Sequence, residues 1–239
     1  MAKYEFKMPK RRQPVFRLAK GIFKLIYPCK KVINLAGELP DKCIFVANHW
    51  AKSGPMALEI HLKKFNVKWG AHEMLEGYRA RRKYLKDVFY IQKHGMGRKK
   101  AAFKATFEAI FSGMIYKGMN FLPTYPDARL ARTIKYSSQV LDNNAAVLVF
   151  PEDSSKGYFE QPTAFFPGFV ILAEKYFKTT GEDVPVVPVH YNKKHKTIVI
   201  GKPSYVQDYV AKGMDRFQIA EDFRGQVNGL YQTYVAKAE

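Results

Sequence analysis

Polar residues that suit acid–base chemistry follow three short apolar runs of the sequence. His49 follows residues 42–47, residues 152–156 follow residues 145–150, and His190 follows residues 184–189. An imidazole titrates near neutral pH, so His49 is a candidate general base. A lone histidine is more often structural, and the residue types alone leave both interpretations open.

The apolar runs predict buried strands, and helical patterns alternate with them. We expect strands at 42–47, 145–150, 184–189 and 197–201, and helices at 127–141 and 168–177. The prolines of 184–189 favour an edge strand or a strand end. This alternation indicates a single α/β domain with a largely parallel sheet flanked by helices. Such sheets carry their chemistry beyond the carboxyl ends of the strands, where the polar residues lie.

The composition excludes a disordered tail and a disulfide-stapled scaffold. The 239 residues are 47% hydrophobic and contain two cysteines, Cys29 and Cys43, which have no metal-ligand spacing. His72-Glu73 lacks the second histidine of a zinc helix, and His190 and His195 lie in a lysine-rich turn, so we expect no metal. Few cysteines favour a reducing compartment, which indicates the cytoplasm.

Two segments carry the whole net charge of +19, namely residues 1–31 with +9 and residues 61–104 with +10. Such patches suit an anionic membrane surface or a nucleic acid. The basic and aromatic stretch 79–90 has no RNA-recognition motif, so nucleic acid is the least favoured partner. Residues 95–100 are expected to form a flexible basic loop, because Gly95-Met96-Gly97 lacks the rest of a dinucleotide fingerprint.

The N-terminal segment has the pattern of a basic amphipathic helix from Val15 onward. Apolar residues recur at helical spacing, with Arg17, Lys20 and Lys24 opposite them and the cluster Lys10, Arg11 and Arg12 before them. We expect residues 1–31 to contact a membrane surface and residues 32–239 to form the α/β domain. The alternative is a helix packed on the protein's own core. Since no apolar run is long enough to span a bilayer, we expect a peripheral protein on the inner face of the membrane.

Four sequence blocks resemble the glycerophospholipid acyltransferases, the family that includes lysophosphatidate acyltransferase. The resemblance runs from about residue 39 to 203. Residues 45–49 (FVANH) match the approach to the family's Asn-His block, and 150–152 (FPE) match its Phe-Pro-Glu block. Pro167-Gly168 with Leu172-Ala173, and residues 184–188 (VPVVP), match the later blocks in the right order.

The resemblance implies a glycerol-3-phosphate acyltransferase-like domain that moves a fatty acyl group in phospholipid biosynthesis. The donor would be acyl-CoA or acyl-carrier protein, used as a cosubstrate with no bound cofactor. The acceptor would be a hydroxyl of a lysophospholipid similar to lysophosphatidate. His49 would remove the proton from that hydroxyl, and Glu152 would help position the acceptor.

The chain departs from the family at two places that matter for the reaction. The family's aspartate that orients the histidine is replaced by Gly54, so we consider Asp153 as a substitute carboxylate, or merely as the cap of a turn. The family's phosphate-binding arginine is replaced by Ser155. Candidate substitutes for binding the acceptor are Ser154, Ser155, Lys156, Arg129 and Arg132, although the arginines also suit a solvated helix face. A catalytically impaired homologue that binds lipid or an acyl carrier is therefore the alternative function.

Overall fold

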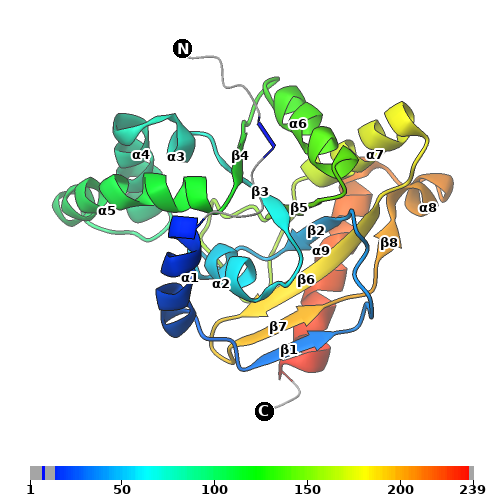
Figure 1. Cartoon of the computed structure of the whole chain (residues 1–239), viewed down its shortest axis with the longest axis horizontal. Coiled ribbons are helices and arrows are strands. Elements are labelled where there is room, and N and C mark those ends of the chain that lie inside the picture. The colour runs from blue at the N-terminus through cyan, green and yellow to red at the C-terminus, as the bar shows by residue number, and fades with distance from the viewer. Residues whose placement is uncertain (1–6, 9–13, 237–239) are drawn as a thin grey trace.

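The computed structural model describes residues 7–8 and 14–236 of the chain (Figure 1). The helices are α1 (Pro14–Ile26), α2 (Ser53–His61), α3 (Glu73–Glu76), α4 (Tyr78–Tyr84), the π-helix η1 (Leu85–Gln92), α5 (Arg98–Gly118), α6 (Leu130–Asp142), α7 (Gly168–Thr180), α8 (Val206–Ala211) and α9 (Arg216–Tyr234). The strands are β1 (Lys31–Asn34), β2 (Ile44–Ala47), β3 (Asn66–Ala71), β4 (Phe121–Thr124), β5 (Ala146–Val149), β6 (Pro185–Asn192), β7 (Thr197–Ile200) and β8 (Ser204–Tyr205). Within these residues, every helix is too short or too polar to cross a bilayer.

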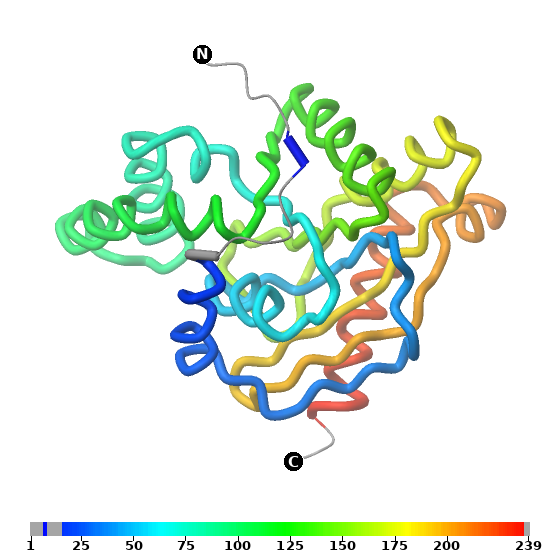
Figure 2. Tube along the Cα trace, in the orientation of Figure 1, coloured from blue at the N-terminus to red at the C-terminus, as the bar shows by residue number. Residues whose placement is uncertain are grey.

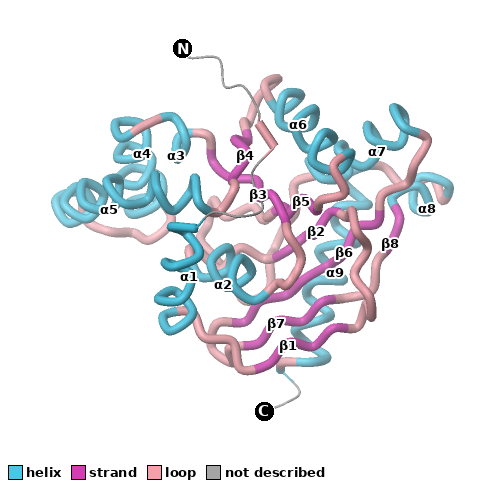
Figure 3. The backbone as a smooth tube through the Cα atoms, viewed as in Figure 1, coloured by secondary structure: helices cyan, strands magenta, loops and turns pink. Residues whose placement is uncertain are grey.

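The strands form one mostly parallel sheet in the order β1-β7-β6-β2-β5-β3-β4, with β8 beside β6. The pairs on both sides of β2 are parallel, whereas β6 pairs antiparallel with β7 and β8. Helices surround the strands, as the colouring in Figure 3 shows. The prediction of an α/β fold with a largely parallel sheet flanked by helices is confirmed.

The central strand β2 is apolar on both faces because helices cover both. Ile44 and Val46 pack into a cluster with α6, α7 and α9, while Phe45 and Ala47 pack into a second cluster with α2. Figure 1 shows α2 on the near side of the sheet and α9 on the far side. A continuous apolar run is the expected sequence of such a doubly covered parallel strand.

Of the two interpretations of the prolines in 184–189, the edge strand is wrong, whereas the strand end holds for Pro185, the first residue of β6. β6 lies inside the sheet, between β2 and β7. The Pro188 carbonyl accepts a hydrogen bond from the Gly201 N–H (2.8 Å), beyond the last residue of β7. Pro188 has no N–H to return a bond to the Gly201 carbonyl, so the pairing with β7 stops here, and β7 ends at Ile200. The proline ring lies where a Cβ on residue 201 would be 2.7 Å from Pro188 Cγ, and glycine leaves that space open.

The predicted N-terminal helix is present as α1, and it uses two faces. Phe16, Ala19 and Phe23 pack with Met119 and Phe121 against the domain. Four other apolar residues point outward and are more than half exposed: Leu18, Ile22, Leu25 and Ile26. The helix is therefore both docked on the core and apolar on its outer side. The basic cluster Lys10, Arg11 and Arg12 lies outside the described residues.

The expected basic loop at 95–100 is wrong in its second half, because α5 begins at Arg98 directly after Gly97. This helix of 21 residues packs against α4 and η1 and extends away from the sheet (Figures 1 and 2). The glycines on both sides of Met96 lie in a short loop, and the basic residues after them belong to α5. The remaining predicted strands and helices are found within a few residues of their expected bounds.

Candidate active site

The loop after β2 fixes the position of His49. Asn48 is fully buried, and its side chain exchanges two hydrogen bonds with the backbone of Tyr191 in β6 (2.9 and 2.8 Å). Trp50 and Ala51 then adopt left-handed backbone conformations, with φ of 41° and 51°. Such conformations are costly for non-glycine residues and persist where the surroundings impose them. The turn holds His49 at the carboxyl end of β2.

Glu152 binds the same turn from the neighbouring strand end. Its carboxylate Oε2 accepts a hydrogen bond from the His49 backbone N–H (2.9 Å). The side chain is buried, and its Oε1 has no hydrogen-bond partner among the described residues. Burial raises the pKa of Glu152, and its backbone hydrogen bonds oppose that shift. The Asn-His and Phe-Pro-Glu blocks therefore meet at one edge of the sheet, as their places after parallel strands predicted.

Aromatic rings hold the His49 imidazole. Tyr158 stacks on it with 5.1 Å between ring centroids, and Phe150 meets it edge-on at 5.0 Å. Its Nδ1 is buried and has no hydrogen-bond partner in the part of the chain that the structure describes. Burial, helped by the positive charge of Lys93, lowers the pKa of His49 to about 3. The imidazole is thus neutral at neutral pH, and the same shift makes it a weaker base than a free imidazole.

The backbone around position 54 leaves no space for the aspartate that the resembling family has there. A Cβ built on Gly54 would lie 2.1 Å from the carbonyl oxygen of His49. Any side chain at position 54 would therefore collide with the backbone of the histidine that it should orient. Packing of the imidazole between two rings replaces a carboxylate as the visible constraint on its orientation.

In the structure, the Asp153 carboxylate binds the backbone of its own loop. Its Oδ1 accepts a hydrogen bond from the Ser155 backbone N–H (2.9 Å), and this bond lowers the pKa of the carboxyl group. That is the geometry of an aspartate that caps a turn. The carboxylate of Asp153 is used by its own loop, whereas the contacts of the His49 ring are aromatic.

The five residues predicted to bind the acceptor separate into two groups. Ser154 lines the cavity described below, and Lys156 lines a smaller pocket beside it. Ser155 is exposed, with its N–H committed to Asp153. Arg129 is exposed and pairs with Asp127 (2.7 Å), and Arg132 is exposed on α6. Both arginines therefore lie on a solvated face of the structure.

An apolar cavity of about 1180 Å³ opens beside His49 and Glu152. Its wall is largely aromatic and aliphatic, and it extends from the strand ends to α1 and α5, where Phe23, Tyr27 and Phe107 line it. Polar groups interrupt the wall at several places, and in one of them Glu108 accepts hydrogen bonds from Lys52 (2.5 Å) and from the Tyr90 hydroxyl. A cavity of this size and lining suits a long apolar ligand.

Lys93 and Tyr158 are site residues that the sequence interpretation missed. Lys93 donates a hydrogen bond to Ser154 Oγ (2.6 Å) and lies over the Tyr158 ring, 5.1 Å from its centroid. Both residues also line a second pocket of about 300 Å³. Its other cations come from two distant segments, Lys156 and Lys193. No local sequence pattern identifies Lys93, because the packing of η1, which it follows, places it at the site.

No family model and no curated protein sequence matches the chain. The fold is similar to the crystal structure of the 1-acyl-sn-glycerophosphate (LPA) acyltransferase PlsC from Thermotoga maritima, with a TM-score of 0.52. The two sequences are 13% identical, and the alignment covers 92% of this chain and 81% of that protein. At this identity the likeness establishes a shared fold, and it agrees with the fold that the sequence blocks predicted.

Proposed function

We propose that the protein transfers a fatty acyl group from acyl-CoA or acyl-carrier protein to a hydroxyl of a lysophospholipid. The observation that carries this proposal is the position of His49 in the wall of an apolar cavity of about 1180 Å³. The cavity suits an acyl chain, and the histidine suits a base for a hydroxyl. The fold shared with an LPA acyltransferase supports the same reaction class.

In the proposed reaction, the neutral imidazole of His49 accepts the proton of the acceptor hydroxyl. The oxygen attacks the thioester carbonyl carbon, the new C–O bond forms, and the C–S bond breaks. The leaving thiolate then takes the proton from the imidazolium. Lys93 supplies positive charge near the negative charge that develops on the carbonyl oxygen, and such fixed charges stabilise a transition state in a site shielded from water.

The phosphate of a lysophosphatidate-like acceptor suits the second pocket. Lys93, Lys156 and Lys193 line it, together with His94. Lysine ammonium groups bind phosphate as point charges, in place of the bidentate arginine expected from the family. Ser154 links this pocket to the cavity through its hydrogen bond with Lys93. Glu152 acts indirectly in this scheme, since its carboxylate holds the backbone of the base.

We further propose that the protein acts at the cytoplasmic surface of an anionic membrane, with α1 in contact with the lipid. The exposed face of α1 carries Leu18, Ile22 and Leu25, with Lys24 beside them. Lysolipids reside in membranes, and attachment brings their hydroxyl near the bound thioester.

One observation favours a second candidate, an impaired homologue that binds lipid or an acyl carrier without turnover. The Nδ1 of His49 lacks a carboxylate partner in the described structure, and Gly54 leaves no space for one. In serine proteases, loss of the carboxylate that orients the catalytic histidine lowers turnover by a factor of about 10⁴.

The test is a panel assay with pure protein, acyl thioesters of several chain lengths and several lysolipids, read by mass spectrometry. We expect a diacyl product with a lysolipid that carries phosphate. Binding of thioester or lysolipid by folded protein with no product from any pair would establish the impaired homologue instead. Acyl transfer to an acceptor without phosphate, but not to lysophosphatidate, would overturn the assignment of the second pocket.

A further inference from the structure

Helix α5 buries small residues and exposes large apolar ones, which is the reverse of an ordinary surface helix. Its packed face consists of small residues at four-residue spacing, namely Ala101, Ala105, Ala109 and Gly113. The fit is close, since a Cβ on Gly113 would lie 2.7 Å from the Arg81 guanidinium. Surface helices of soluble proteins bury their large apolar residues, whereas α5 buries the small ones.

Five large apolar residues of α5 point outward instead, whereas Ile115 and Tyr116 pack inward. The exposed fractions of the five are 66% for Phe103, 53% for Phe107, 56% for Ile110, 62% for Phe111 and 62% for Met114. Exposed apolar side chains so closely spaced on one helix are uncommon on a protein that stays in water, and they indicate a covered surface. We call these five residues the α5 face.

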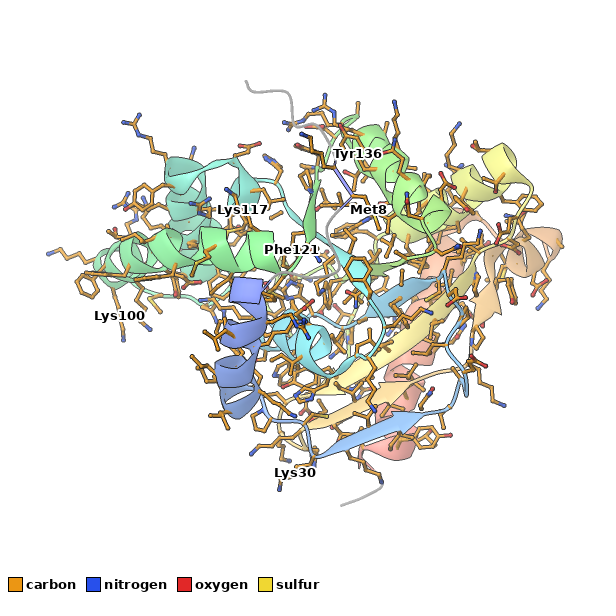
Figure 4. The ribbon with its side chains drawn as sticks, viewed as in Figure 1. Met8, Lys30, Lys100, Lys117, Phe121 and Tyr136 are labelled. Carbon is orange, nitrogen blue, oxygen red and sulfur yellow. The ribbon has the colours of Figure 1, made fainter. Side chains whose placement is uncertain are left out.

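The charges of α5 indicate what covers this face. The helix contains five cations, namely Arg98, Lys99, Lys100, Lys104 and Lys117, and the single acid Glu108. Glu108 is paired with Lys52 in the cavity, so the exposed charge of the helix is positive. Figure 4 shows Lys100 at the end of α5 that extends away from the domain, and Lys117 near its other end. Apolar residues flanked by cations complement an anionic lipid surface.

The α5 face is continuous with the cavity and with α1. Phe103, Phe107 and Phe111 are exposed and also line the cavity, so one set of rings borders both solvent and the acyl site. α1 meets the other end of α5, where Phe16 fills the space over Gly118. Figure 2 shows the two helices adjoining at this end of the molecule.

We propose that α5 is a second membrane-docking element, whose face inserts into the headgroup boundary of an anionic bilayer. In that position the cavity opens on the lipid phase between the aromatic rings of α5. An acyl chain then reaches His49 without crossing water, and this consequence rests on the proposed acyl transfer. The docking itself does not depend on catalysis.

Ile110 and Met114 allow a clean test, because they belong to the α5 face but do not line the cavity. The variant Ile110→Ser/Met114→Ser is compared with wild type in sedimentation with phosphatidylglycerol vesicles. The matched control Val210→Ser/Phe217→Ser removes exposed apolar residues from α8 and α9. We expect the first variant to lower the partition coefficient about tenfold, and the control to leave it within twofold.

A second pair tests the charge. Lys99→Glu/Lys100→Glu is expected to reduce the preference for phosphatidylglycerol over phosphatidylcholine vesicles several-fold, whereas Lys175→Glu/Lys178→Glu on α7 retains it. Equal vesicle binding by wild type and the Ile110/Met114 variant would overturn the proposal. So would a wild-type dimer that does not bind vesicles and that this variant converts to monomer, since the face would then be an interface between copies.

Transfer to a detergent-dispersed lysolipid separates this proposal from the proposed function. The Ile110/Met114 variant should retain that activity and lose transfer to lysolipid in vesicles. Vesicle binding that depends on α5, in a protein without transfer under either condition, would support the docking surface and contradict the proposed function.

Discussion

Replacement of Gly54 by alanine tests the geometry around His49, because that geometry decides whether the free energy of unfolding rises or falls. Gly54 lies in α2, and a helical glycine replaced by alanine normally gains about 0.5–1 kcal/mol. Here the added Cβ would be 2.1 Å from the His49 carbonyl oxygen, whereas contacts under 3.0 Å are essentially never seen. The backbone must therefore move by about 0.9 Å, the difference between these distances, and such overpacking costs about 1–3 kcal/mol.

We expect Gly54→Ala to lower the free energy of unfolding, measured by urea titration. Gly225→Ala is the matched control, because it lies in α9 with no atom within 4 Å of its added Cβ. That control should gain stability. An increase for Gly54→Ala equal to that of Gly225→Ala would refute the close approach and the explanation built on it.

Gly54→Asp extends the same test to function, because it places a carboxylate where the family that the sequence blocks resemble has one. The aspartate has the same Cβ, so we expect the same displacement of the His49 carbonyl and a loss of transfer. A rise in turnover with Gly54→Asp would show that the turn accepts a carboxylate, and that aromatic packing is a poor substitute for it.

Three further variants address the charges near the site and in the core. Lys93→Met removes a cation that lowers the pKa of His49, so that pKa should rise. The acid limb of the kcat/KM profile should then move to higher pH, and an unchanged limb would contradict this coupling. Asp153→Asn should keep turnover within a few-fold of wild type, since the carboxylate caps a turn, and a 100-fold loss would restore it as the orienting group. Glu59→Gln removes the carboxylate that neutralises the fully buried Lys68 and should cost about 3–5 kcal/mol in urea unfolding, with a cost under about 1 kcal/mol arguing against the pair.

The central sheet could be predicted from the sequence because its strands are apolar on both faces. β2 and β5 appear as short continuous apolar runs, and helices on both sides of the sheet impose that pattern. The edge placement of β6 was wrong, because the effect of Pro188 depends on where β7 ends. That information lies in the pairing of two strands and not in either one alone.

Helix α5 escaped prediction for a different reason. Its outward aromatic residues and inward alanines reverse the usual pattern, and two glycines precede it. Sequence rules assume that water surrounds a surface helix. The rule fails where another apolar phase covers the surface, which is the situation that we propose for this helix.

The candidate site was predictable where its residues follow strands directly. His49 and Glu152 come after β2 and β5, and the parallel pairing of these strands brings the two residues together. Lys93 and Tyr158 come from the turn after η1 and from a loop, and the positions of both depend on the whole fold. The local sequence therefore located the candidate base but not the groups that contact its ring and shift its pKa.

The central claim is that the neutral imidazole of His49 is the base for acyl transfer. Its most direct test compares initial rates of wild type and His49→Ala with saturating acyl thioester and the preferred lysolipid. We expect the variant to fold normally, to bind vesicles like wild type and to lose transfer by a factor of about 10²–10⁴. A rate within twofold of wild type would contradict the claim and assign the reaction to another group.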